Sequence, residues 1–265
     1  MALPPSIRER IPFGLRVTIR RLPALLRHAA RSLGPAERLE RAPVGFAHTQ
    51  ASRSSPLRRQ GTAYRGGRQQ AKEHNVERAA QRLDGVVIPP GAEFSWHREV
   101  GPPLRVNGFV PGPELHDGRL EMGGGGGACQ LANLLYYLAA VGGLEVLERH
   151  RHGLDLFPDD DRRVPFGLGA TVFYPHRDLR LRNPFPQPVH LQFQVRDGQL
   201  HGRLSLAQDP GLRFQVVEEG HRFVRRPDGI WRENHLFRVG SDGRRELLSH
   251  NLAKVTYTLD PALLS

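Results

Sequence analysis

The only cysteine of the chain follows directly on a run of glycines. Residues 123–127 are five consecutive glycines, and Ala128 and Cys129 come next. Glycine disfavours a helix, whereas the residues from Ala128 onward favour one, so Cys129 falls in the first turn of a predicted helix. Backbone N–H groups and the dipole at a helix N-terminus stabilise a thiolate, and the same N–H groups can hold an oxyanion. The spacing therefore predicts a cysteine nucleophile of lowered pKa beside an oxyanion-binding loop formed by Gly126, Gly127 and Ala128.

The predicted helix also gives the thiol a direction. At about 100° per residue, Cys129 lies on the side of Asn133 and Tyr136, away from a stripe of leucines that begins at Leu131. We therefore expect the thiol to point away from the core, with Gln130, Asn133 and Tyr136 lining a substrate groove. The alternative is that Cys129 is a small buried apolar residue without chemistry.

A nucleophilic cysteine needs a base, and two histidines are placed to supply one. His150 and His152 follow a strand-like apolar segment about one helix length after Cys129. A helix that reverses into an adjacent strand returns such a histidine to the helix N-terminus, and residues two apart on a strand face the same side. Asp155 and Asp178 each border an apolar segment, which makes them candidates to orient the imidazole.

Two other chemistries fit these residues less well. A metal site built from Cys129, His150 and His152 lacks a second cysteine or a carboxylate at ligand spacing. A phosphate cradle at residues 123–127 lacks the Gly-Lys-Ser/Thr ending of a P-loop and a preceding strand. We therefore expect no metal and no cofactor, and we interpret the acidic run 159–161 as a solvated loop.

The positive charge of the chain is concentrated at its N-terminal end. Residues 1–70 hold 14 basic and three acidic residues, which accounts for the whole formal net charge of +11. The remainder of the chain is balanced, so nucleic acid is not an expected partner of the folded body.

Residues 1–45 form a predicted basic amphipathic extension. Apolar residues recur there at helical spacing with arginines between them, which is typical of a helix on an anionic membrane surface. The alternatives are a helix docked on its own domain and a solvated tail. Arginines interrupt every apolar stretch, so we expect no cleaved signal peptide or transmembrane helix, and a location in the cytoplasm or at the inner membrane face.

The remaining elements alternate between helix and strand and then become strands only. A polar linker is predicted at 46–69 and a helix at 68–83, with short strands at 86–88 and 93–96. Six further strands are predicted at 170–174, 189–195, 199–206, 214–218, 236–239 and 252–259. Three Asp-Gly pairs, at 197–198, 228–229 and 242–243, favour tight hairpin turns.

These elements predict an α+β fold. A helix capped by the glycine loop should pack on a mainly antiparallel sheet, with β-hairpins at the C-terminus. We expect a core domain over residues 70–205 and a hairpin extension of the same domain over residues 206–265.

Several ordered motifs resemble those of the VanW family. The stretch 124–131 is similar to its Gly-rich Cys-Gln signature, and 148–152 to its Glu-Arg-His-x-His segment. The likeness covers about residues 70–205 and is tightest from 119 to 183. Further matching residues are Gln69, Lys72, Asn75, 89–96, 169–172, Asp178, Leu179 and Asn183.

The resemblance implies an association with the cell envelope. Some domains of the family look like L,D-transpeptidases whose signature cysteine is the nucleophile, so Cys129 would attack a peptidoglycan stem peptide or its precursor with His152 as the base. Gly169 stands where many members have Asp, so no orienting role is expected at that position. The sequence favours an enzyme, and the alternative is a non-catalytic module of glycopeptide resistance that binds peptidoglycan peptides or a partner.

Overall fold

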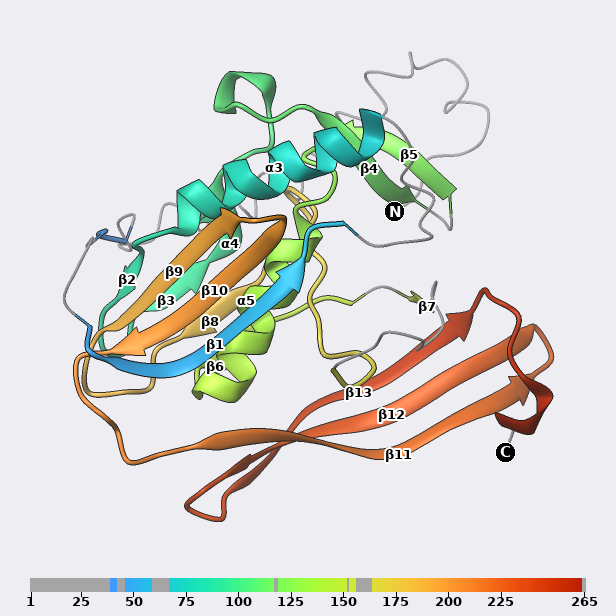
Figure 1. Cartoon of the computed structure of the whole chain (residues 1–265). Helices are drawn as coiled ribbons and strands as arrows, with labels where there is room; N and C mark the ends of the chain where they lie inside the picture. The colour runs from blue at the N-terminus through green and yellow to red at the C-terminus, as the bar shows by residue number, and fades with distance from the viewer. Residues whose placement is uncertain are drawn as a thin grey trace, which may run out of the picture.

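The computed structural model describes most of the chain from residue 39 onward (Figure 1). The N-terminal helix predicted within 1–45, the acidic run 159–161 and His152 lie outside the described residues. The described ranges are 39–41, 46–58, 67–116, 119–151, 153–155 and 164–263.

One antiparallel sheet carries the strand order β1-β10-β9-β2. Its strands are β1 (His48–Pro56), β10 (Gln199–Leu206), β9 (Val189–Arg196) and β2 (Val87–Ile88). The predicted turn between β9 and β10 is confirmed, because Asp197 and Gly198 both have positive φ, 52° and 70°, as a tight hairpin requires. The linker predicted at 46–69 differs from the structure, in which His48–Pro56 forms an edge strand of this sheet.

A second sheet is formed mainly by the C-terminal part of the chain. Its order is β11-β12-β13-β7, with β11 (Phe214–Arg226), β12 (Gly229–Gly240), β13 (Arg245–Val255) and the two-residue β7 (Leu154–Asp155), which pairs parallel to β13. These strands extend well beyond the short runs predicted at 214–218 and 236–239. The prediction for β12 was too short because its buried face is mostly polar. Arg232, Asn234 and Arg238 are buried there beside Leu236, so the alternation of apolar and polar residues that indicates a strand is missing from the sequence.

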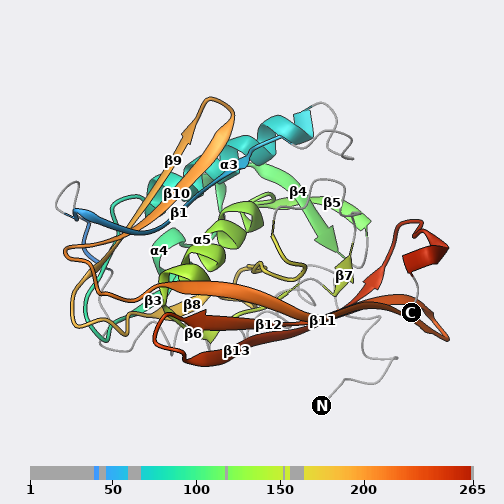
Figure 2. The ribbon, with the colours of Figure 1, turned by 60° about the horizontal axis from the view of Figure 1, so that its bottom comes forward.

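Helix α5 (Cys129–Gly142) lies between the two sheets (Figure 2). It contacts β1 and β10 on one side and β11 on the other. Because both sides are covered, its buried residues extend well beyond the predicted leucine stripe and include Ala132, Tyr136 and Ala140. Burial on both sides explains why apolar residues surround nearly the whole helix.

The remaining elements are one long helix and several short strands and helices. Helix α3 (Gly67–Leu83), predicted at 68–83, packs on β9 and against the hairpin of β4 (Pro111–His116) and β5 (Arg119–Gly124). A small sheet joins β3 (Glu93–Ser95), β8 (Arg180–Arg182) and β6 (Glu145–Glu148). The other short elements are α4 (Trp96–Val100), η1 (Arg105–Asn107) and η2 (Pro261–Leu263).

The predicted α+β class is confirmed, with helices few and the sheets mainly antiparallel. The prediction of a strand at 170–174 is wrong, since only an isolated bridge between Phe173 and Arg177 forms there. Within the described part of the chain, no helix is long and apolar enough to cross a membrane.

Candidate functional site

Neighbouring residues of the protein pack closely against the glycine run before α5. A Cβ atom at Gly126 would come within 3.0 Å of the backbone of Gly112 and Pro113 in β4. At Gly127, where φ is +99°, a Cβ would come within 2.6 Å of the Lys72 side chain, and Gly125 faces Pro103 as closely. Such distances exclude any side chain without movement of the neighbours. Internal packing therefore already requires glycine at these three positions.

The backbone N–H groups of the loop are also largely used. The N–H of Ala128 donates to the Gly125 carbonyl at 3.1 Å, and the N–H of Gln130 donates to the Gly127 carbonyl at 3.0 Å. An oxyanion role for Gly126, Gly127 and Ala128 stays a prediction, and for Ala128 it requires the hydrogen bond to Gly125 to rearrange.

The Cys129 thiol lies at the start of α5 in an enclosed position. Its Sγ donates to the carbonyl of Val172 at 3.5 Å, and although the residue keeps some exposed surface, the thiol is surrounded by protein. Burial raises the pKa of the Cys129 thiol above its ordinary value; the Val172 contact lowers it, the Glu114 carboxylate raises it and the Arg177 guanidinium lowers it. The predicted lowering of the pKa is wrong in sign, because desolvation is the largest influence on this thiol.

The His150 segment lies beside the residue whose carbonyl accepts the hydrogen bond of the thiol. The His150 carbonyl accepts from the N–H of Thr171 at 2.9 Å, and Thr171 directly precedes Val172. The His150 imidazole is partly exposed, and its Nε2 lies 3.0 Å from Glu148 Oε1. Cys129 and the histidine segment are thus joined through residues 171–172, while the His150 ring is paired with Glu148.

The two candidate orienting carboxylates have different partners. Asp178 is buried, accepts from Ser95 Oγ at 2.6 Å and from the N–H of His97 at 3.0 Å, and has its Oδ1 4.0 Å from His97 Nδ1. Asp155 instead pairs with the buried Arg232 at 3.2 Å and accepts from the Tyr257 hydroxyl.

Asp178 therefore faces a histidine that the sequence did not single out. His97 is buried, and its ring lies edge-on to Tyr174 with centroids 5.1 Å apart. The signal available for it was its position directly after the family-like element 89–96. Within the residues that the structure describes, no three His, Cys, Asp or Glu side chains are grouped as a metal site.

The predicted groove residues of α5 act as internal ties. Gln130 Nε2 donates to the Pro56 carbonyl at 2.8 Å, and Asn133 Oδ1 accepts from the N–H of Ala170 at 2.8 Å. Tyr136 is fully buried under the Arg149 guanidinium, 4.9 Å from the ring centroid, and burial raises the pKa of its phenol. Tyr136 reaches a ligand only if the core opens, whereas Gln130 and Asn133 lie at the helix surface.

Side chains of α3 hold the glycine loop and the end of β1 together. Asn75 Nδ2 donates to the carbonyls of Gly126 and Val110, each at 2.9 Å. Lys72 Nζ donates to the Leu57 carbonyl at 2.7 Å, and Gln69 Nε2 donates to the same oxygen at 3.3 Å. The sequence placed these α3 residues in a motif without assigning them a role, and the structure assigns them the support of the loop before Cys129.

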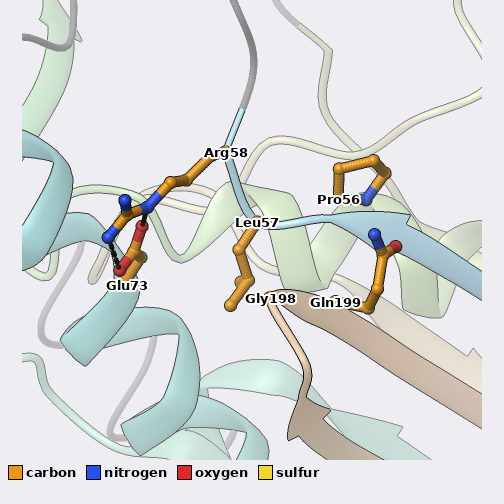
Figure 3. Close-up of a pocket in the computed structure, with 6 residues that line it drawn as sticks. All are labelled: Pro56, Leu57, Arg58, Glu73, Gly198 and Gln199. Carbon is orange, nitrogen blue, oxygen red and sulfur yellow. Dashed lines mark hydrogen bonds and ion pairs between the residues drawn. The ribbon is translucent and has the colours of Figure 1, made fainter.

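A pocket opens beside this support, between the end of β1, the β9–β10 turn and α3 (Figure 3). Its volume is about 400 Å³. Arg58 and Glu73 form a bidentate ion pair at its rim, with N–O distances of 2.6 and 3.2 Å. The residues that line it are Pro56, Leu57, Arg58, Glu73, Gly198 and Gln199.

Comparison with known proteins assigns the family. A model described as "VanW like protein" matches residues 71–205, which include α3, the glycine loop, Cys129 and the histidine segment. The chain belongs to the VanW family. It is thereby related to proteins of vancomycin resistance, as the sequence motifs predicted.

Two curated relatives of this VanW-family chain extend the match. It is 26% identical over 197 residues to the "Vancomycin B-type resistance protein VanW" of Enterococcus faecalis (strain ATCC 700802 / V583), covering 72% of each chain. It is 29% identical over 133 residues to the "Uncharacterized protein YoaR" of Bacillus subtilis (strain 168), covering 49% of this chain and 41% of that protein. No solved structure matches the chain.

Proposed function

We propose that this VanW-family protein is a cysteine-dependent acyltransferase, similar to an L,D-transpeptidase, that acts on peptidoglycan stem peptides. Cys129 Sγ attacks the peptide carbonyl carbon, and a C–S bond forms as the C–N bond to the leaving amine breaks. The thiol proton passes to a base and from it to the leaving amine. An acceptor amine then attacks the thioester and forms a new C–N bond as the C–S bond breaks, and the proton that the amine loses returns to the sulfur and regenerates the thiol.

The observation that carries the proposal is the junction at residues 171–172. The Val172 carbonyl accepts a hydrogen bond from the Cys129 thiol at 3.5 Å, and the N–H of its neighbour Thr171 donates to the His150 carbonyl at 2.9 Å. The two segments that chemistry requires, nucleophile and histidine, therefore meet at consecutive residues although they are about 20 positions apart in the chain. His152, which the family resemblance assigns as the base, belongs to the same segment.

The raised pKa of the thiol defines how such a reaction must start. A buried thiol of raised pKa is neutral at pH 7, so the proton must leave as the S–C bond forms rather than beforehand. The Arg177 guanidinium opposes the Glu114 carboxylate at this point and favours the developing thiolate. The Arg177 charge would remain beside the thiol when a bound peptide excludes water.

The same burial favours a second function, a non-catalytic module that binds envelope peptides or a resistance partner. An enclosed thiol packed against a carbonyl behaves as a small apolar residue. In that case the glycine loop and the start of α5 form a recognition surface without turnover.

Intact-protein mass spectrometry separates the two functions. The full chain and its Cys129→Ala and His152→Ala variants are incubated with disaccharide tetrapeptide and pentapeptide fragments, with the exposed His74→Ala as matched control for the histidine change. An acyltransferase gives an adduct of acyl-fragment mass in the parent and in His74→Ala, little in His152→Ala and none in Cys129→Ala. Absence of adduct in every protein, with peptide binding kept in Cys129→Ala, rejects the enzyme and supports the binding module.

A further inference from the structure

The pocket beside the glycine loop is built from three segments that are distant in the chain. Leu57 closes its floor: the side chain is buried, and the backbone N–H donates to the Gly198 carbonyl at 2.9 Å. Glu73 reaches the rim from α3, and Gln199 begins β10 on the opposite side (Figure 3). A Cβ added at Gly198 would meet no atom within 4 Å, so the turn borders open space.

Of the two charged side chains at the rim, Glu73 is fixed by several hydrogen bonds and Arg58 is largely exposed. Glu73 accepts from Gln69 at 2.8 Å as well as from Arg58, and its side chain is 24% exposed, whereas that of Arg58 is 71% exposed. The hydrogen bonds from Arg58 hold the pKa of Glu73 below its ordinary value, so the carboxylate is ionised at neutral pH. An exposed arginine gives up such a pair at little cost, because solvent screens the attraction.

This arrangement has the chemistry to recognise a zwitterion. We propose that the pocket binds a free amino-acid end, in which an ammonium and a carboxylate share one carbon, with Glu73 taking the ammonium and Arg58 turning to take the carboxylate. Pro56 and Leu57 form an apolar floor that contacts the side chain of the ligand. The volume of the pocket, about 400 Å³, suits a small ligand.

Hydrogen bonds connect the pocket to the start of α5. Gln130, the neighbour of Cys129, donates to the Pro56 carbonyl, and Lys72, which packs on Gly127, donates to the Leu57 carbonyl. If the proposed acyl transfer is right, an amino-acid end held here is the acceptor amine. That role rests on the proposed function, whereas the binding itself does not.

Ligand-observed saturation-transfer NMR on the full chain tests the binding. Alanine carries both charges, alaninamide only the ammonium and N-acetylalanine only the carboxylate. We expect alanine to bind at millimolar concentration, with at least a tenfold weaker affinity for alanine and alaninamide in Glu73→Gln. Arg58→Gln should weaken alanine, whereas alaninamide should bind at least as well as to the parent, because its ammonium no longer competes with Arg58 for Glu73. Glu77→Gln, on the exposed face of the same helix, and Arg203→Gln, on the exposed surface of β10, are the matched controls and should change nothing.

A blocking variant and a thiol variant complete the test. Gly198→Asn places a side chain in the open space, and Asn tolerates the positive φ of +70° at that turn, so it should abolish binding of all three probes without unfolding the hairpin. Cys129→Ala should bind alanine as the parent does, which separates this site from acyl transfer. Absence of saturable alanine binding, or equal affinity in the parent and Glu73→Gln, overturns the assignment.

Discussion

The close packing of the glycine loop predicts that Gly126 is needed for the stability of the fold, and this can be distinguished from a need for glycine only when a substrate binds. In Gly126→Ala the new methyl group would overlap the backbone of Gly112 and Pro113, at less than 3.0 Å. If the glycine were needed only for a substrate, the folded protein would accept the methyl group at no cost. If internal packing requires it, the substitution destabilises the fold before any ligand is added.

The magnitude follows from what the methyl group meets. Overpacking costs about 1–3 kcal/mol, and the upper part of that range applies here because backbone atoms cannot rotate aside as a side chain does. For a domain of this size, 1 kcal/mol shifts Tm by about 2–4 °C, so we expect Gly126→Ala to lower Tm by about 6–12 °C.

Thermal unfolding followed by circular dichroism measures the effect, with Gly67→Ala as the matched control. A Cβ at Gly67 meets nothing within 4 Å, and an alanine at the start of α3 should leave Tm unchanged or raise it slightly. Displacement of the loop in Gly126→Ala should also speed iodoacetamide modification of Cys129 at fixed pH. Equal Tm values for the two variants would refute the packing argument.

Three further perturbations test the site and the core. Iodoacetamide modification of Cys129 should require a higher pH than a free thiol does, and still higher pH in Arg177→Gln, because loss of the positive charge raises the pKa further; a profile at or below that of free cysteine contradicts the burial argument. Asp178→Asn should lower the free energy of urea unfolding by about 1–3 kcal/mol, because one amide nitrogen cannot accept what a carboxylate oxygen accepts; an unchanged midpoint would disprove this. Arg232→Ala should cost about 3–5 kcal/mol by leaving Asp155 buried without its guanidinium, and a loss no larger than that of an exposed arginine variant such as Arg225→Ala would argue against a buried pair.

Local signals in the sequence were sufficient for the elements that depend on local structure. The helices at 67–83 and 129–142 follow from helical periodicity and from the glycine run that must end before α5 begins. The Asp197-Gly198 hairpin follows from the backbone freedom of these two residues. The α+β class then follows from one central helix and a series of hairpins.

The errors concern features that depend on a distant partner. Strand β1 was interpreted as a linker because an edge strand needs few apolar residues, and in β1 only Ala51 is buried. The raised pKa of Cys129 depends mainly on the burial of its thiol by segments distant in the chain, which periodicity does not reveal. The pairing of Asp178 with His97 joins positions 81 apart in the chain, and no spacing rule connects them.

The C-terminal sheet explains how a region outside the family match bears on the family's own residues. The match ends at residue 205, yet β13 holds both sides of position 152: Arg151 donates to the Leu252 carbonyl, and the N–H of Lys254 donates to the Gly153 carbonyl at 3.1 Å.

The residue before His150 is held by the same sheet. Arg149 bonds to the carbonyls of Gly167 and Gly169, and its guanidinium lies 3.5 Å from Asn251 Oδ1 in β13. Two buried polar residues of β12 bind residues outside this segment: Asn234 donates to the Phe166 carbonyl at 2.8 Å, beside the Gly167 that Arg149 contacts, and Arg232 pairs with Asp155. A sheet with an apolar inner face would bury the segment without fixing it, whereas directional hydrogen bonds set the position of its backbone. Hydrogen bonds from the C-terminal sheet therefore fix residues on both sides of the histidine segment, on which the proposed acyl transfer depends.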